Sequence, residues 1–211
     1  MERRLPERVV ASRRVFSGRL ISVRVDDVVL LDGTTTTREI VSHPGAVAVV
    51  PLLANGRVVL IRQYRHAAEK TLWEIPAGTL RGGESPEECA RRELIEETGY
   101  EAGQLAPLFS LHLSPGYTTE LIHLFLACDL RQGRQQADSD ERIDVVVLTM
   151  EEALAMVESG EVQNAAAVCG LLAAARWGGQ EAAREKCHRS RNQSRVAGRR
   201  RRSCAEGEQP P

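Results

Sequence analysis

Three glutamates in the segment 78–100 have a spacing that suits metal chemistry. Glu93, Glu96 and Glu97 stand at i, i+3 and i+4, so a helix would place their carboxylates on one face of a single turn. Like charges at this spacing repel one another, and Arg92 can offset only part of that repulsion. Carboxylate oxygens are the ligands that Mg²⁺ and Mn²⁺ prefer. We therefore interpret this face as a divalent-cation site rather than as a merely solvated surface.

Helix-boundary residues enclose these glutamates. Ser85 suits an N-cap, Pro86 suits the first helical position, and Glu88 completes a capping box. Gly99 stands where a helix commonly ends in a left-handed residue. The sequence therefore predicts a helix between these limits. The three glycines of the segment 78–83 precede that helix, and they would let backbone carbonyls approach the same cation.

The spacing of these residues resembles the Nudix box, the signature of hydrolases that cleave a nucleoside diphosphate linked to another moiety. Gly78 is followed after five residues by Glu84, and after seven more by Arg92-Glu93-Leu94-Ile95-Glu96-Glu97-Thr98-Gly99-Tyr100. Every fixed position matches. The last position, usually aliphatic, is Tyr100, a substitution similar to that of the ADP-ribose pyrophosphatase branch. A match at this many fixed positions is highly specific.

More of the chain, roughly residues 15–177, resembles that branch. His43-Pro44-Gly45-Ala46-Val47 is similar to the family's first core strand, and Arg62–Arg65 with Leu72–Gly78 to the approach to its catalytic loop. Ser114-Pro115-Gly116 is similar to the proline segment after the box. Gln163-Asn164-Ala165-Ala166 is similar to the start of the last helix.

The resemblance implies a metal site built around the box. Its ligands would be Glu93, Glu97, Glu96, the backbone carbonyl of Ala77 and, as a further ligand or a support of the others, Glu84. Arg92 would orient the carboxylates by charge-assisted hydrogen bonds, and with Glu96 it would belong to the catalytic machinery. The implied cofactor is Mg²⁺, with Mn²⁺ as the alternative.

Further residues would bind the substrate or activate water. In this branch the base is often a glutamate in a loop beyond the box, and Glu141 in the acidic loop 135–143 fits best, with Glu120 as runner-up. Arg65 matches an arginine that contacts the diphosphate, for which a planar guanidinium is suited. The resemblance also assigns three other residues to the substrate site. Glu39 would contact the adenine or the ribose, and Arg38 stands where some relatives stack a tryptophan on the base. The third residue is Pro115.

The implied reaction is metal-assisted hydrolysis of ADP-ribose to AMP and ribose 5-phosphate. Enzymes of this branch are usually homodimers in which the N-terminal strands, here about 15–41, cross to the partner. One alternative is a related hydrolase of another nucleotide sugar or a dinucleotide, which Arg38 in place of an aromatic residue supports. Another is a non-catalytic nucleotide-sensing module, but such modules tend to lose the box acids that this chain retains.

Hydrophobic patterning and turn residues predict an α/β (α+β) fold. Strands are expected at 23–31, 34–41, 46–53, 57–63, 121–130 and 143–148, with hairpins at Asp32-Gly33 and Asn55-Gly56. Helices are expected at about 86–98, 150–158 and 165–177. The family resemblance refines this to a Nudix-type α/β/α sandwich with a mixed central sheet. The expected divisions are an N-terminal antiparallel β segment (1–44, dimerising), a Nudix domain (45–178) and a disordered basic tail (179–211).

Composition excludes several other classes of protein. The 211 residues are 42% hydrophobic and 27% charged, which is typical of a globular chain of about one domain. Neither a membrane-spanning run nor a secretory signal is visible, so a cytoplasmic protein with no membrane partner is expected. The net charge of −1 hides a basic C-terminus, and nucleic-acid binding by the folded part is not expected. The five cysteines show no zinc-site spacing.

Overall fold

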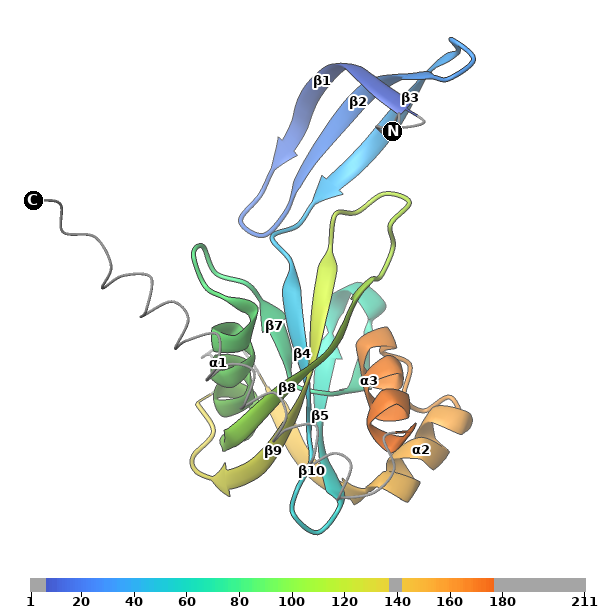
Figure 1. Ribbon diagram of the computed structural model, residues 1–211. Coiled ribbons are helices and arrows are strands. Elements are labelled where there is room, and N and C mark those ends of the chain that lie inside the picture. Colours follow the sequence, from blue (N-terminus) through green and yellow to red (C-terminus); the bar gives the residue numbers. More distant parts are fainter. Residues whose placement is uncertain (1–6, 137–141, 177–211) are drawn as a thin grey trace, which may run out of the picture.

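The N-terminal strands form a small sheet of their own in the computed structural model, which describes residues 7–136 and 142–176. Strands β1 (Glu7–Ser17), β2 (Ser22–Leu30) and β3 (Thr35–Ser42) pair antiparallel in that order. The predicted turn at Asp32-Gly33 joins β2 to β3, with Gly33 at φ 86°. Figure 1 shows this sheet standing beyond one end of the main body. It is therefore a separate layer rather than part of the central sandwich.

Two further sheets make up the body. One has the order β7-β4-β9-β8, with β4 (Ala46–Pro51) parallel to β9 (Leu121–Gln132), and β7 (Ala77–Thr79) and β8 (Tyr100–His112) antiparallel to their neighbours. The other has the antiparallel order β10-β5-β6, formed by Ile143–Thr149, Arg57–Arg65 and Lys70–Glu74, with a short 3₁₀ turn at His66–Ala68.

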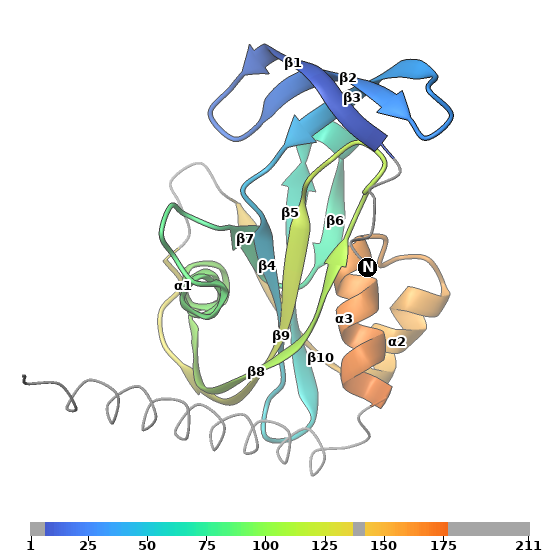
Figure 2. The same cartoon turned by 45° about the horizontal axis from the view of Figure 1, so that its top comes forward.

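Helices cover both sides of these sheets, as Figure 2 shows. On one side lies α1 (Pro86–Thr98), and on the other lie α2 (Met150–Glu158) and α3 (Ala165–Arg176). Leu94 of α1 packs with Val47 and Val59, whereas Leu171 of α3 packs with Val50 on the opposite side. This mixed-sheet sandwich, preceded by an antiparallel β segment, confirms the predicted fold class.

The prediction of a hairpin at Asn55-Gly56 was wrong in its strand pairing. The turn forms, with Gly56 at φ 81°, but only Leu52 and Val58 bridge across it. The strands then diverge into different sheets. Because β4 is buried along its whole length and β5 along most of it, each becomes a central strand with other partners. A turn signal specifies a local reversal of the chain and leaves the pairing partner open.

Some elements were not predicted, and one prediction lies outside the described chain. The sequence did not indicate β1, β6, β7 or β8. In β1 all residues but the first are exposed, and β8 contains Gly103 and Pro107, so neither shows the usual alternation. The predicted tail 179–211, and Trp177 at the predicted end of α3, lie outside the described residues. Among the described residues, no helix is long and apolar enough to cross a membrane.

The predicted ends of α1 are confirmed. Ser85 Oγ accepts a hydrogen bond from the Glu88 amide, and the Glu88 carboxylate accepts one from the Ser85 amide. At the other end Gly99 adopts φ 76° and its amide donates to the carbonyl of Ile95. Both ends satisfy backbone groups that would otherwise lack partners, which fixes the length of the helix.

We expect Ser85→Ala to lower the free energy of unfolding by about 1 kcal/mol, because the first turn of α1 loses its side-chain acceptor. Ser85→Thr keeps a hydroxyl at the cap and serves as the matched control. Urea denaturation followed by circular dichroism measures both. An equal loss of stability in the two variants would contradict the capping explanation.

Candidate functional site

Arg92 lies at the centre of a cluster of carboxylates on α1 and the loop before it. Its Nε and Nη2 donate to the two carboxylate oxygens of Glu84, at 2.8 and 3.0 Å. Its Nη1 donates to Glu93 Oε1 at 2.5 Å and to Glu96 Oε2 at 2.8 Å. The structure thus brings together, around one guanidinium, three of the glutamates that the sequence singled out. With Glu97 they form what we call the carboxylate cluster.

The electrostatics of the cluster are strongly coupled. Hydrogen bonds from Arg92 lower the pKa of Glu84 to about 2, and the same bonds raise the pKa of Arg92. Burial raises the pKa of Glu93, against the opposing effect of its bond to Arg92. The three carboxylates share Arg92 and a second guanidinium, that of Arg81, whose Nη2 lies 3.6 Å from Glu96 Oε2. The three therefore keep an excess of negative charge when they are ionised.

Glu97 ties α1 to the strand beside it. The residue is only 2% exposed, and its Oε2 accepts a hydrogen bond of 2.9 Å from the Ala77 amide in β7. Its backbone carbonyl accepts a further bond from Gln135 Nε2 at 2.7 Å. The segment at Ala77, for which the sequence predicted a ligand carbonyl, is therefore held directly against the helix.

Gly78 lets this segment pass close over the cluster. A Cβ atom at this position would lie 2.0 Å from the carboxylate of Glu93, a distance that no real contact reaches. An added side chain would force the Glu93 carboxylate to move aside, whereas glycine leaves it where it bonds to Arg92.

The chemistry of the donor set fits a hard divalent cation. The cluster offers carboxylate oxygens, which Mg²⁺ and Mn²⁺ prefer, and carries excess negative charge. Within the described part of the chain, no three acidic, histidine or cysteine side chains already converge in a metal-binding arrangement. Three of the carboxylates are turned onto Arg92 instead. A bound cation would therefore take over some of the contacts that Arg92 makes.

A second charged group lies on β5 and β6. Arg65 donates from Nε and Nη2 to the two carboxylate oxygens of Glu74, at 2.9 and 2.6 Å. Glu74 is 1% exposed, whereas 40% of the Arg65 side chain is accessible. The buried carboxylate thus fixes a partly accessible guanidinium. Sequence reasoning missed Glu74, although its place three residues before Ala77 was a signal that could have drawn attention to it.

Four of the other predicted residues, all in the described part of the chain, take no part in the hydrogen bonds of the carboxylate cluster. Arg38 and Glu39 lie on β3 of the N-terminal sheet, where Arg38 forms an ion pair with Glu7 at 2.6 Å. Pro115 and Glu120 lie in the loop between β8 and β9. That loop joins the end of β3 through hydrogen bonds of Val41 with the backbones of Tyr117 and Thr119. Glu141 lies outside the described residues.

Comparisons with known proteins agree on one family. A model of the NUDIX domain matches residues 42–168, and a model of the nucleoside diphosphate sugar hydrolase N-terminal domain matches residues 7–41. The chain is 44% identical to "ADP-ribose pyrophosphatase" of Bacillus subtilis (strain 168), covering 76% of this chain and 88% of that protein. It is 42% identical to "Methanol dehydrogenase activator" of Bacillus methanolicus, covering 78% and 90%. A crystal structure of an "ADP compounds hydrolase" superposes with a TM-score of 0.73 at 25% identity, covering 82% and 94%.

We expect Gly78→Ala to weaken Mn²⁺ binding by roughly tenfold or more, because the new methyl group would displace the Glu93 carboxylate. Electron paramagnetic resonance of free Mn²⁺ measures the affinity. Gly82→Ala is the matched control, since a Cβ atom at Gly82 meets nothing within 4 Å. Equal affinities in both variants would show that the close approach at Gly78 is unimportant for the cation.

Proposed function

The chain belongs to the NUDIX family, and on that premise we propose that it hydrolyses the diphosphate bond of ADP-ribose, releasing AMP and ribose 5-phosphate. The observation that carries this proposal is the carboxylate cluster beneath the Gly78 backbone. The identity with an ADP-ribose pyrophosphatase over most of both chains supports the choice of substrate. The dehydrogenase-activating role in the name of the Bacillus methanolicus relative has no support in the described features of this chain.

NUDIX hydrolases generally need a divalent metal ion, and we propose Mg²⁺, with Mn²⁺ as a substitute. Its ligands would be the carbonyl of Ala77 and the carboxylates of Glu84, Glu93, Glu96 and Glu97. Such a cation would neutralise charge on the diphosphate oxygens and favour ionisation of the attacking water. Arg92 would orient the ligand carboxylates of Glu84, Glu93 and Glu96 by charge-assisted hydrogen bonds, as it bonds to all three now.

Other residues would bind the substrate and accept the proton. The partly accessible guanidinium of Arg65, fixed by Glu74, would bind the diphosphate through paired hydrogen bonds. We propose Glu141 as the general base, with Glu120 as the second candidate. The adenosine end would contact Arg38, Glu39 and the loop around Pro115. With positioning and charge stabilisation supplied in this way, little covalent chemistry is left to the protein.

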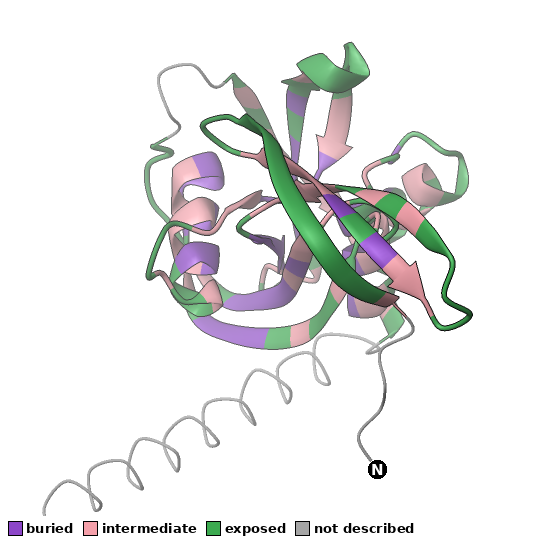
Figure 3. Cartoon of the chain, turned by 90° about the horizontal axis from the view of Figure 1, so that it is seen from above, coloured by how far each residue is buried: buried purple, intermediate pink, exposed green. Residues whose placement is uncertain are grey.

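We further propose that the protein acts as a cytoplasmic homodimer. Figure 3 shows β1 exposed along its length, and Val9, Val10, Val15 and Phe16 are each about half exposed. An exposed edge strand with apolar side chains is a surface that proteins usually cover. A second copy would cover it and would supply Arg38 and Glu39 to the neighbouring cluster. In this division residues 1–44 dimerise, 45–178 form the catalytic domain, and 179–211 have no catalytic role.

We expect purified protein with ADP-ribose and Mg²⁺ to release AMP, and EDTA to abolish the release because the diphosphate charge is no longer neutralised. Chromatography of the nucleotide products measures this. A GDP-sugar and a dinucleotide, assayed in parallel, should give at least about tenfold lower kcat/KM. A higher kcat/KM with either of them would transfer the proposal to that substrate.

We expect light scattering to give about twice the chain mass of 23.2 kDa. Phe16→Asp should shift the protein toward the monomer, because a carboxylate buried at the interface lacks a partner. Leu31→Asp, the same kind of change at an exposed residue outside β1, is the matched control. A wild-type protein that is monomeric at micromolar concentration would contradict the dimer.

A further inference from the structure

Gln63 is a buried polar side chain that the proposed mechanism does not use. It is 7% exposed, and its Oε1 has no hydrogen-bond partner among the described residues. Burying a carboxamide oxygen without a donor is unfavourable. Such atoms are rare in native proteins, and a bound ligand or water is a common reason for them. The question is therefore from which donor this oxygen accepts a hydrogen bond.

The register of β5 places Gln63 on the side of the sheet that α1 covers. Val59, four residues earlier on the same strand face, packs with Leu94 of α1. Across the ladder Gln63 stands opposite Ile143 of β10, and Val145, on the same face of that strand, belongs to the same cluster. Because side chains alternate along a strand, Gln63 points toward the α1 side.

On that face the ion pair of Arg65 and Glu74 spans the position of Gln63. Glu74 stands opposite Ile61, so the two partners of the ion pair are four residues, or about 13 Å, apart along the strands. Their side chains meet over the place where Gln63 stands opposite Leu72. Gln63 therefore lies on the same face as this ion pair and between its two partners along the strands, although its Oε1 accepts no hydrogen bond from the guanidinium.

The chemistry of this oxygen restricts its partner. A carboxamide oxygen only accepts hydrogen bonds, and ionised phosphate oxygens also only accept them. The diphosphate itself is thereby excluded as the donor. A sugar hydroxyl and a water molecule both carry the required O–H group.

We propose that Gln63 belongs to the active site, where its Oε1 accepts a hydrogen bond from an O–H group bound beside the Arg65 guanidinium. The O–H group is either a hydroxyl of the sugar beyond the diphosphate or a water molecule on the diphosphate. This inference rests on the proposed function, because Arg65 is assigned to the diphosphate there. It adds a binding residue on β5 to a site otherwise described from the box.

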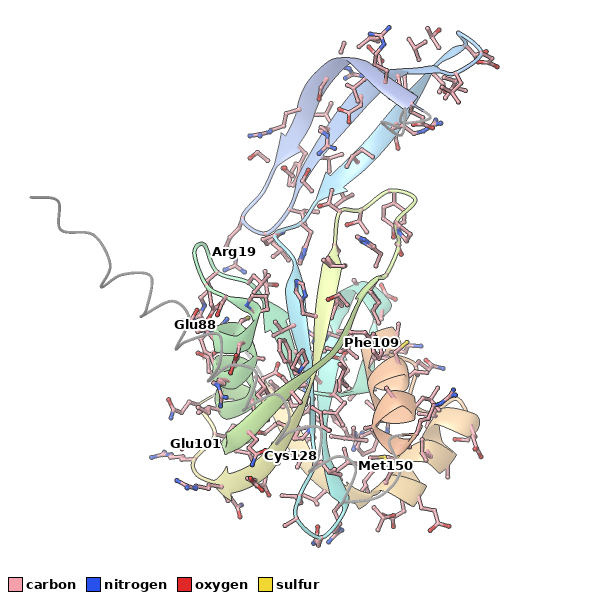
Figure 4. The ribbon with its side chains drawn as sticks, viewed as in Figure 1. Arg19, Glu88, Glu101, Phe109, Cys128 and Met150 are labelled. Atoms are coloured by element: carbon pink, nitrogen blue, oxygen red, sulfur yellow. The ribbon has the colours of Figure 1, made fainter. Side chains whose placement is uncertain are left out.

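The test compares Gln63→Met with Gln104→Met. Gln104 is a matched control: it is 8% exposed, its Oε1 also lacks a partner, and only its Nε2 donates, to Asp129. It stands opposite Cys128, which Figure 4 places in the lower half of the body, whereas β5 runs toward the N-terminal sheet. We expect Gln63→Met to lower kcat/KM for ADP-ribose by roughly ten- to a hundredfold at an unchanged or higher Tm. Gln104→Met should leave kcat/KM within about twofold.

A second substrate separates the two sources of the O–H group. The β-methyl ester of ADP has a diphosphate but no sugar beyond it. A loss in Gln63→Met with ADP-ribose alone identifies a sugar hydroxyl, whereas an equal loss with both substrates identifies water. Unchanged kcat/KM with both substrates overturns the proposal, and so does an equal loss in Gln104→Met. Gln63→Leu repeats the measurements with a second apolar side chain in case the methionine variant is unstable.

The experiment also distinguishes a failure of the proposed function from a failure of the proposal about Gln63. Wild-type protein that hydrolyses neither substrate would refute the proposed function itself. Calorimetric binding of ADP-ribose to the same variants then decides the role of Gln63. A Kd weakened roughly tenfold in Gln63→Met but not in Gln104→Met would support it, and equal Kd values would overturn it.

Discussion

The balance of charge around Arg92 is the interaction on which the rest of the site depends. Carboxylates spaced by three and four residues on a helix repel one another, and partial burial strengthens that repulsion because water screens it less. The Arg92 guanidinium bonded to Glu84, Glu93 and Glu96, together with the Ala77 amide bonded to Glu97, lets the four side chains gather. Arg81, 3.6 Å from Glu96, adds a second positive charge. A cation would supply the positive charge that is still missing.

This balance requires α1 and the neighbouring backbone to form one unit. Four contacts join them. They are the Glu97 bond to Ala77, the close passage of Gly78 over Glu93, and the contacts of Cys89 Sγ and Arg92 Nη2 with the Thr79 carbonyl at 3.6 and 3.4 Å. The buried face of α1 packs on β4, with which β7 pairs. The backbone that carries the site is thus held in place without a ligand, whereas the carboxylates bonded to Arg92 would turn to meet a cation.

What the sequence could predict follows from how local each signal is. The ends of α1 and the meeting of its glutamates with Arg92 depend on residues within about two turns, and the structure has them as predicted. The pairing partners of β4 and β5 depend on which strands are buried on both faces of a sheet. A local sequence pattern does not contain this information. The sequence did not identify Gln63 and Glu74 as site residues for the same reason. Their position beside Arg65 depends on the register of β5 against its neighbouring strands. Without that register, they are ordinary polar residues in strands.

The divergence of β4 and β5 also explains how the two halves of the site are assembled. The carboxylate cluster lies on α1 and the loop before it, against the sheet of β4 and β7, whereas Arg65, Glu74 and Gln63 belong to the sheet of β5 and β6. The turn at Asn55-Gly56 carries the chain from one sheet to the other, and the shared core between them contains Val47, Val49 and Val59. The distance between metal-binding and diphosphate-binding groups is therefore set by the packing of small, fully buried side chains. An enlarged side chain in this core would separate the two halves without touching either.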